Sequence, residues 1–490
     1  MFIQPFLLSN SLCSSLKSVA LAVIASTFLA VCAVAQNNPV PQIVGPVHPS
    51  AVAPGGGDFT LNVYGANFVP GAVVNWNYQP RATTYVSGHE LQATIFSTDI
   101  AKKTAGYISV TNPAPGGGSS SASWAQVEVH DPISTVTFNS PNYYFFGFWN
   151  LVLADFNHDA VLDVVGELGH DLALELGTGA GTLKPQSIVG RFQYPSTQVG
   201  YGDFTGSGNL GVVYVPGPSG YSQYVDQMAI MLGDGKGNFT KGPTTTSESG
   251  FQMLSVGDFN RDGKLDVVSV GHFLTTFLGK GDGTFTQGTN YPYQTIALQW
   301  VAGDFNGDGI LDLMLFTVNP FSIRFLEGNG DGTFKKPKLI ASFSNERGCT
   351  GAALQDELQV SDFNGDGKLD FAFCDSSQVG IFLGNGDGTF QPPSFYTADS
   401  TGMGHFSYAL GDINSDGKPD LLISEYSNYK APQFVVLLGN GDGTFQSPST
   451  TNVNLIATPE EGITVGDFNS DGLLDVVFQT GLGDYVFLQQ

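Results

Sequence analysis

Short runs in which apolar and polar residues alternate make up much of residues 40–130. This alternation is the pattern of half-buried β-strands. The run 59–64 is a clear case, because every second side chain is apolar. Turns rich in glycine and proline separate such runs every 8 to 15 residues, which predicts a small immunoglobulin-like β-sandwich. Its predicted strands are 59–64, 72–76, 91–96, 107–111 and 124–129, and residues 36–46 are expected to form an exposed linker.

A longer pattern begins near residue 133 and continues to residue 490. The stretch 251–291 shows one complete unit, in which an acidic loop joins the first strand to the second and a Gly-Asp-Gly turn joins the third to the fourth. Its predicted strands are 253–259, 265–270, 273–278 and 285–291. The acidic loop recurs seven times at intervals of 46 to 58 residues, which indicates a repeat architecture. Four antiparallel strands in each of seven units predict an all-β fold, a seven-bladed β-propeller over 133–490.

The last repeat unit ends at residue 490 before a fourth strand. A strand candidate at 134–138 precedes the first acidic loop. We expect this segment to complete the seventh blade, because closing the ring removes the exposed edges that an open array of strands would carry.

The N-terminus is typical of an export signal over residues 1–35. Lys17 is the only charge there, an apolar run follows at 19–34, and small residues precede Gln36. A membrane anchor is the alternative, but the 16-residue run is shorter than the roughly 20 residues of a spanning helix. Lipid attachment at Cys32 is a further alternative, although valine is a poor residue before the cysteine. The sequence therefore predicts a secreted or cell-surface protein with no transmembrane segment after cleavage.

Acidic residues outnumber basic ones by 44 to 19, so the net charge is −25. Of the 44 acids, 19 are aspartates of the seven acidic loops, so much of the charge belongs to the repeats. Such a surface should repel nucleic acid and anionic lipid headgroups. We expect a monomer with no nucleic-acid partner.

Five of the acidic loops read D-x-N-x-D-G-x-x-D. They start at Asp258, Asp304, Asp362, Asp412 and Asp467. The loop at Asp155 keeps its carboxylates but has Ala160 in place of glycine, while the loop at Asp203 has lost all but one. Alternate residues of a curling backbone face one side, and the glycine permits the positive φ that reverses the chain.

Oxygen ligands on alternate residues around a tight turn favour Ca²⁺ over Zn²⁺ or Mg²⁺. Turns without metal are the alternative, since Asp, Asn and Gly form turns anyway. Bare turns would not need three crowded carboxylates in five copies, so we predict five calcium sites and a possible sixth at Asp155. The candidate ligands are Asp258, Asn260, Asp262, Asp266, Asp304, Asn306, Asp308, Asp312, Asp362, Asn364, Asp366, Asp370, Asp412, Asn414, Asp416, Asp420, Asp467, Asn469, Asp471, Asp475, Asp155, Asn157, Asp159 and Asp163.

The motif Asp-Phe-Asn-x-Asp-Gly-x-Leu-Asp and the turn Leu-Gly-Asn-Gly-Asp-Gly-Thr-Phe, found at 383–390 and 438–445, resemble the FG-GAP/VCBS repeat family and, more distantly, the propeller of integrin alpha subunits. The resemblance covers 133–490 and implies a propeller with calcium in its acidic loops. Residues 40–130 resemble the IPT/TIG domains of exported bacterial proteins, through 63–68, 73–76 and 110–118.

Two cysteines, Cys349 and Cys374, flank the Asp362 loop. An exported protein permits a disulfide bond between them. The sequence leaves open whether the geometry does.

Long insertions should lie on the face opposite the acidic loops, and aromatic or cationic residues on such loops favour recognition. Long solvated loops without a ligand are an equal alternative. The insertions carry Tyr221, Tyr224, Arg347, Tyr426, Tyr429 and Lys430. No G-x-S-x-G or H-E-x-x-H motif occurs, so no catalytic residue is predicted. We expect a binding protein for glycans or proteins, in which the sandwich is a spacer. A polysaccharide-active enzyme using Glu357, Glu425, Glu460 or Glu461 is one alternative, and a purely structural envelope module is another.

Overall fold

The computed structural model describes residues 37–490, which form one compact unit, with internal gaps. The residues outside the description are 1–36, 46, 121–124, 145–148, 169–170, 192–197, 217–224, 252, 272, 292–296, 318–320, 344–357, 376–377, 398–404, 428–429, 453–458 and 481–482. The described part is all-β and contains no helix. The predicted signal segment lies outside it.

Residues 42–129 form two sheets that share one hydrophobic core, which includes Leu61, Val74, Trp76 and Val127. One sheet has the order β1 (Gln42–Ile43), β3 (Phe59–Ala66), β7 (Glu90–Ile95) and β6 (Thr83–Tyr85). The other has β2 (Ala51–Val52), β10 (Gln126–Val129), β8 (Thr104–Asn112), β4 (Val73–Trp76) and β5 (Gln79–Pro80), and β9 (Gly118–Ser119) pairs with β8. Each of the five predicted sandwich strands overlaps one of these strands.

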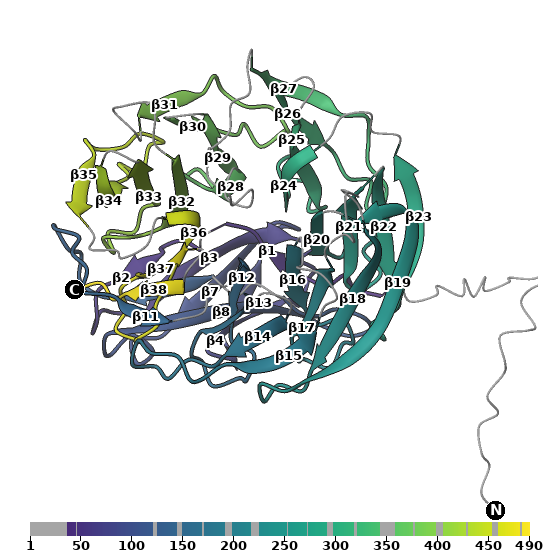
Figure 1. The fold of residues 1–490 in the computed structure, drawn as a ribbon, viewed down its shortest axis with the longest axis horizontal. Coiled ribbons are helices and arrows are strands. Elements are labelled where there is room, and N and C mark those ends of the chain that lie inside the picture. Colours follow the sequence, from purple (N-terminus) through teal and green to yellow (C-terminus); the bar gives the residue numbers. More distant parts are fainter. Residues whose placement is uncertain are drawn as a thin grey trace, which may run out of the picture. The chain divides into compact units, whose positions relative to one another are not determined.

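The remaining described residues form seven four-stranded antiparallel sheets that follow one another around a ring (Figure 1). The first three are β12 (Trp149–Ala154), β13 (Asp163–Leu168), β14 (Asp171–Glu175) and β15 (Ser187–Arg191); β16 (Gln198–Gly202), β17 (Gly211–Val215), β18 (Val225–Gly233) and β19 (Phe239–Phe251); and β20 (Met253–Gly257), β21 (Asp266–Val270), β22 (Leu274–Gly279) and β23 (Phe285–Tyr291). The next three are β24 (Ala297–Gly303), β25 (Asp312–Thr317), β26 (Ser322–Leu326) and β27 (Lys338–Ser342); β28 (Leu358–Ser361), β29 (Asp370–Asp375), β30 (Gln378–Phe382) and β31 (Ser394–Thr397); and β32 (His405–Gly411), β33 (Asp420–Ser427), β34 (Lys430–Leu437) and β35 (Ser449–Asn452). The seventh has the order β11 (Asn142–Tyr144), β38 (Gly483–Phe487), β37 (Asp475–Thr480) and β36 (Pro459–Gly466).

The seventh sheet joins the two ends of the repeat region, because β11 pairs with β38. The closing strand therefore comes from the N-terminal side, as expected, but the strand paired in the sheet lies at 142–144, just after the predicted 134–138. The residue before the predicted segment contacts the Asp412 loop, where the amide of Ile133 donates to the carbonyl of Asn414 at 2.9 Å. The predicted segment still meets the chain that continues β38, where Phe138 forms an isolated bridge with Gln489 and the amide of Gln490 donates to the carbonyl of Thr137 at 3.0 Å.

The prediction of an exposed linker at 36–46 is also wrong. Val40, Ile43 and Val44 are buried. Strand β1 pairs with β3, while Val40 and Val44 join hydrophobic clusters of the ring. The polar and proline-rich composition of the segment hides this burial, which comes from contacts between residues far apart in sequence.

A repeated aromatic pair joins one sheet to the next at five places. The phenylalanine after the first aspartate of one loop packs against the phenylalanine of the following Gly-Asp-Gly turn, as in Phe305 and Phe390 at 6.2 Å. The turn also donates a backbone hydrogen bond to the loop, from Gly388 to the carbonyl of Phe305 at 3.1 Å. Aromatic pairs of this kind contribute about 0.5–1.5 kcal/mol beyond their burial. The repeated Asp-Phe and Thr-Phe dipeptides therefore serve the packing between sheets.

Candidate metal centres

Each acidic loop folds its first aspartate onto the backbone amides of the same loop. In the loop that starts at Asp304, Oδ1 accepts from the amide of Asp308 at 3.1 Å and Oδ2 accepts from Gly309 at 2.7 Å. Asn306 Oδ1 accepts from the Asp308 amide at 2.9 Å, and Asp308 Oδ1 accepts from Ile310 at 2.9 Å. The side-chain oxygens of alternate residues thus accept backbone amides of their own loop.

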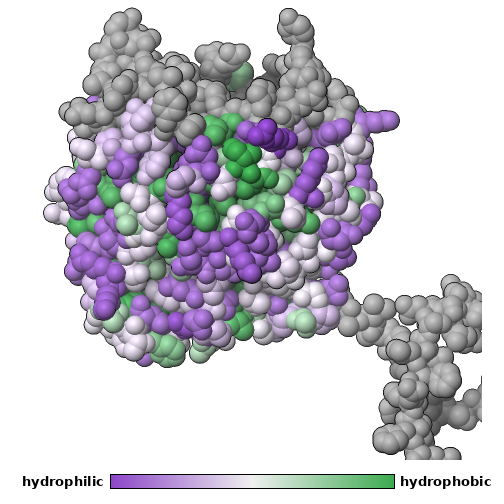
Figure 2. All heavy atoms as spheres, turned by 60° about the horizontal axis from the view of Figure 1, so that its bottom comes forward, coloured by the Kyte–Doolittle hydropathy of each residue, from purple (hydrophilic) through white to green (hydrophobic). Residues whose placement is uncertain are grey.

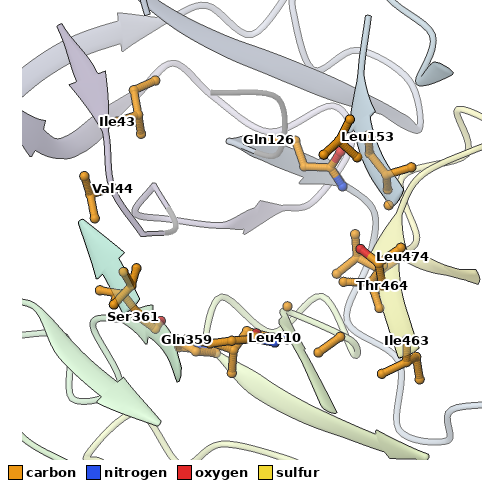
Figure 3. A pocket seen from close by; sticks show the side chains of 18 of the residues that line it. Ile43, Val44, Gln126, Leu153, Gln359, Ser361, Leu410, Ile463, Thr464 and Leu474 are labelled. Carbon is orange, nitrogen blue, oxygen red and sulfur yellow. Dashed lines mark hydrogen bonds between the residues drawn. The ribbon is translucent and has the colours of Figure 1, made fainter. Parts of the chain in front are cut away.

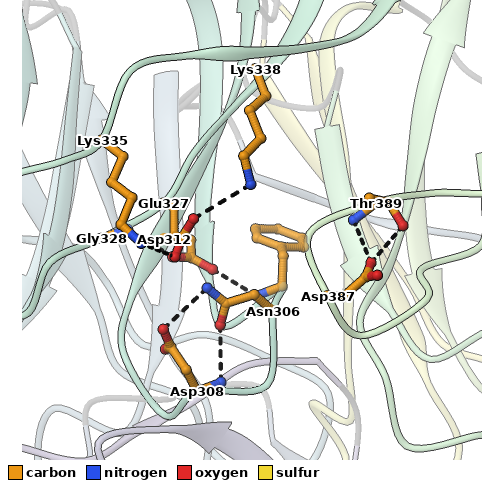
Figure 4. Close-up of polar contacts among 10 residues, drawn as sticks. Asn306, Asp308, Asp312, Glu327, Gly328, Lys335, Lys338, Asp387 and Thr389 are labelled. Carbon is orange, nitrogen blue, oxygen red and sulfur yellow. Dashed lines mark hydrogen bonds and ion pairs between the residues drawn. The ribbon is translucent and has the colours of Figure 1, made fainter.

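The ninth aspartate of the loop is the first residue of the following strand. Asp312 is fully buried at the start of β25, where Oδ2 accepts from Phe305 at 3.1 Å and Oδ1 accepts from Gly328 at 2.8 Å. Figure 4 shows Asn306, Asp308 and Asp312 near one another in this loop. Asp163, Asp266, Asp370, Asp420 and Asp475 occupy the same position and are equally buried. The ninth residue therefore fastens the loop to its own strand and to the neighbouring turn.

Burial and neighbouring carboxylates disfavour the ionised form of the aspartates in these loops. The pKa of Asp312 is raised to about 8, first by burial and then by Asp304 and Asp308, against hydrogen bonds that lower it. Burial likewise raises the pKa of Asp304 to about 6. The described ion pairs of the loops involve only the fifth aspartate, as in Lys368 with Asp366. Buried charges in proteins are usually paired or coordinate a metal.

The donor chemistry fits calcium, since the loops offer carboxylate, amide and backbone oxygens and no thiolate. Among the described residues, however, no three acidic, histidine or cysteine side chains form an assembled metal-binding group. The carboxylates turn toward backbone amides instead. The loops match calcium in the type and sequence position of their residues. The ligand set stays a prediction. A bound calcium would supply the positive charge that the buried aspartates lack.

The two irregular loops differ in what they keep. In the Asp155 loop, Ala160 has a φ of 61° and its amide still donates to Asp155 Oδ2 at 2.7 Å. The Asp203 loop keeps the turn with one carboxylate, which accepts from Ser207 at 3.1 Å and from Gly208 at 2.5 Å. The sequence predicts this outcome for Asp203, a turn without a metal ligand set.

The fourth residue of each loop is a feature that the sequence analysis misses. It adopts positive φ in all the loops that keep their carboxylates, for example 74° at Gly307 and 59° at Arg261. Only the sixth position carries an obvious glycine signal, while the fourth varies among Gly, Ser, Arg and His. Glycine or serine occurs at the fourth position of most loops, and this is the sequence feature that indicates a positive φ there.

A cavity of about 500 Å³ lies at the centre of the ring. Figure 3 shows that side chains from several inner strands line it, including Leu153, Leu410 and Ile463. Ile43 and Gln126 of the sandwich also line it. Its lining is mainly aliphatic, and Glu128 and Asp412 are the charged residues among those that line it.

A second hollow lies on the edge of the ring opposite the acidic loops, between the ends of β19 and β23. It is lined by Thr246, Ser247, Glu248, Ser249, Phe273, Gln287 and Asn290. Figure 2 shows one face of the molecule, where hydrophilic residues predominate and hydrophobic ones are interspersed. The predicted recognition residues Tyr221, Tyr224, Arg347 and Tyr429 lie outside the described residues, and the side chains of Tyr426 and Lys430 are likewise not described.

Cys374 is buried and takes part in a disulfide bond. Cys349, the partner that the sequence offers, lies outside the described residues. Within the described residues, no helix is long and apolar enough to cross a membrane.

A family described as FG-GAP-like repeat matches the chain at residues 203–269, 258–315, 362–423 and 426–478. The chain thus carries FG-GAP-like repeats, as the acidic-loop motif predicts. The resemblance of residues 40–130 to IPT/TIG domains stays a prediction. The sequence has no match among curated proteins.

Two solved structures are distantly similar. A lectin from Agrocybe aegerita that recognises non-reducing terminal N-acetylglucosamine is 16% identical with a TM-score of 0.47, over 76% of this chain and 92% of the lectin chain. An auxiliary nutrient binding protein from Bacteroides ovatus is 14% identical with a TM-score of 0.38, over 92% of this chain and 98% of that chain. Because these TM-scores are low, the fold is described from the sheet topology of this chain alone.

Proposed function

We propose that the protein is an exported, calcium-binding β-propeller of seven blades, with an immunoglobulin-like sandwich, that acts in extracellular recognition or adhesion. Its ligands would be glycans or proteins at the cell surface. The proposal assigns no catalytic activity.

The repeated burial of aspartates without cationic partners carries the calcium part of this proposal. In the loops that start at Asp258, Asp304 and Asp467, both the first and the ninth aspartates are buried. Backbone amides offset part of the cost of burying each carboxylate, but they carry no net positive charge. A divalent cation bound by oxygen ligands would supply that charge at every such loop.

The arrangement of the ring supports recognition as its role. Acidic loops and Gly-Asp-Gly turns occupy one edge of the sheets, which leaves the opposite edge to the connections between second and third strands. The hollow on that opposite edge combines the exposed ring of Phe273 with hydroxyl, amide and carboxylate groups. Aromatic rings and polar groups held on a rigid scaffold are typical of binding surfaces.

The experiment is incubation of purified residues 36–490 with a panel of polysaccharides, in calcium and in EDTA, with retention and new reducing ends both measured. Retention without cleavage, lost in EDTA, is the expected result. New reducing ends would replace the binding proposal with the enzyme alternative. Of the glutamates considered for that enzyme, Glu357 lies outside the described residues, and the side chains of Glu425, Glu460 and Glu461 are not described.

Calcium binding itself is measured separately by isothermal titration of the same chain after removal of metal. We expect five or six ions per chain. Absence of binding would contradict the calcium part of the proposal, whatever the polysaccharide panel shows.

A further inference from the structure

The sandwich contacts the acidic loops directly. Tyr78 of the sandwich donates its hydroxyl to Asp155 Oδ2 at 2.7 Å, and its ring stacks on His158 at 5.3 Å. Ser50 Oγ donates to Asp412 Oδ2 at 2.7 Å, and the amide of Val40 donates to Asp258 Oδ2 at 2.7 Å. Two parts of the sandwich and the segment just before it thus reach the first aspartate of three loops.

All three donors reach the same carboxylate oxygen, Oδ2, which already accepts the amide of the sixth loop residue. These amides belong to Ala160, Gly417 and Gly263, at 2.7, 2.7 and 2.9 Å. Two donors on one oxygen fix the rotation of the carboxylate. Outer partners that orient a metal-ligating side chain commonly change metal affinity by about 10–100-fold when they are removed.

The other loops with intact carboxylates also lie against the sandwich. The amide of Asn67 donates to the carbonyl of Gly309 at 3.0 Å. A Cβ added at Gly367 would lie 3.2 Å from Tyr64 Oη, and one added at Gly472 would lie 2.7 Å from the carbonyl oxygen of Val129. The sandwich therefore approaches the six loops that keep the predicted carboxylates.

The degenerate loop is the exception. Within the described residues, no hydrogen bond joins the sandwich to the loop that starts at Asp203. Contact with the sandwich and retention of the carboxylates thus occur in the same loops.

We propose that metal binding in these loops and seating of the sandwich on the ring stabilise each other, with Tyr78 and Ser50 as positioning residues for the Asp155 and Asp412 sites. This inference rests on the proposed calcium sites. Coupling between two binding equilibria is reciprocal, so a sandwich that holds the first aspartate strengthens metal binding by the same factor as metal strengthens the seating. The side chains of Tyr78 and Ser50 and the backbone of Val40 would carry this coupling.

The test combines calcium titration with hydrogen exchange of the full chain, followed by mass spectrometry of peptides from 37–44, 77–80 and 155–163. Calcium should slow exchange in the two sandwich peptides as well as in the loop. Tyr78→Phe keeps the ring but removes the hydroxyl donor, and should weaken calcium at the Asp155 loop by about tenfold. Ser50→Ala should do the same at the Asp412 loop.

Tyr85→Phe is the matched control, because Tyr85 is an exposed tyrosine of the same sandwich and should change neither readout. Calcium binding that leaves exchange in 37–44 and 77–80 unchanged would overturn the coupling while leaving the calcium sites intact. Unaltered calcium affinity in both Tyr78→Phe and Ser50→Ala would overturn the role of these residues. No calcium binding at all would overturn both this inference and the proposed function.

Discussion

The loops at Asp304 and Asp203 share a turn but differ in their carboxylates. In both, the first aspartate accepts the amides of the fifth and sixth loop residues. In both, the fourth and sixth residues are glycines with positive φ, at 74° and 78° in one loop and 69° and 86° in the other. The turn therefore needs one aspartate and two left-handed residues, and it forms without the other acids.

This comparison separates folding of the turn from the purpose of the additional acids. The Asp203 loop has Ser207 and Gly211 where the Asp304 loop has Asp308 and Asp312. Since the turn survives without those carboxylates, their retention in six loops indicates another role. The proposed metal binding would account for three crowded anions in each loop.

Removal of calcium should have the largest effect. A site with a dissociation constant of about 0.1 mM in about 1 mM calcium contributes about 1.4 kcal/mol to the free energy of unfolding, so five independent sites contribute about 7 kcal/mol. EDTA should therefore lower the melting temperature markedly, as measured by calorimetry. Melting curves that coincide in calcium and in EDTA would contradict calcium binding by the loops that keep their carboxylates.

A buried carboxylate outside the loops gives the next largest effect. Burial raises the pKa of Glu175 on β14 to about 7, and its Oε2 has no hydrogen-bond partner within the described residues. A raised folded-state pKa means that ionisation costs stability, so the penalty is absent below about pH 4.5 and complete above about pH 7. Glu175→Gln should thus raise the free energy of unfolding by about 3 kcal/mol at pH 8 and leave it unchanged at pH 4.

Chemical denaturation at the two pH values, in EDTA, measures this effect without calcium. Glu90→Gln is the control, since Glu90 is partly exposed and accepts a hydrogen bond from Gln92 at 3.1 Å. An equal gain at both pH values would show that the stabilisation does not come from ionisation. The effect of burying a carboxylate without a hydrogen-bond partner, as at Glu175, can then be compared with the effect of burying the loop aspartates, which accept backbone amides.

The local features of the repeats could be predicted from the sequence, because they depend on residues close together in the chain. The loop that starts at Asp304 and the strand boundaries near 253–291 follow from turn-forming residues and alternation. The closing strand could be placed on the N-terminal side but not at its residues, because only pairing with β38 distinguishes 142–144 from 134–138. Seating of the sandwich on the loops depends on contacts such as Tyr78 with Asp155, which leave no local sequence pattern.

One carboxylate in an intact loop should have a smaller effect than removal of all the calcium. Asp308→Asn keeps an oxygen that can accept the amide of Ile310 but removes a charge from the site. The expected result is loss of one bound ion and a decrease of about 1.4 kcal/mol in the free energy of unfolding in calcium, with little change in EDTA. Ser207→Asn places the same residue at the equivalent position of the degenerate loop and should change neither quantity. A similar decrease for Asp308→Asn in EDTA would assign the carboxylate to the turn rather than to a metal.

The smallest expected effect concerns the sixth position of the Asp155 loop. Ala160 holds a φ of 61°, which disfavours any residue with a Cβ, while glycine adopts it freely but loses more entropy on folding. Ala160→Gly should therefore stabilise the protein by roughly 0.5 kcal/mol.

Gly472→Ala is the converse control, because its φ is 84° and the added Cβ would lie 2.7 Å from the carbonyl oxygen of Val129, so it should destabilise. Thermal melts in EDTA isolate the backbone effect, and a further gain for Ala160→Gly in calcium would show that the alanine also weakens metal binding. Loss of stability in Ala160→Gly would instead mean that the alanine side chain stabilises the loop, and the Asp155 loop would then differ from the intact loops by more than one strained residue.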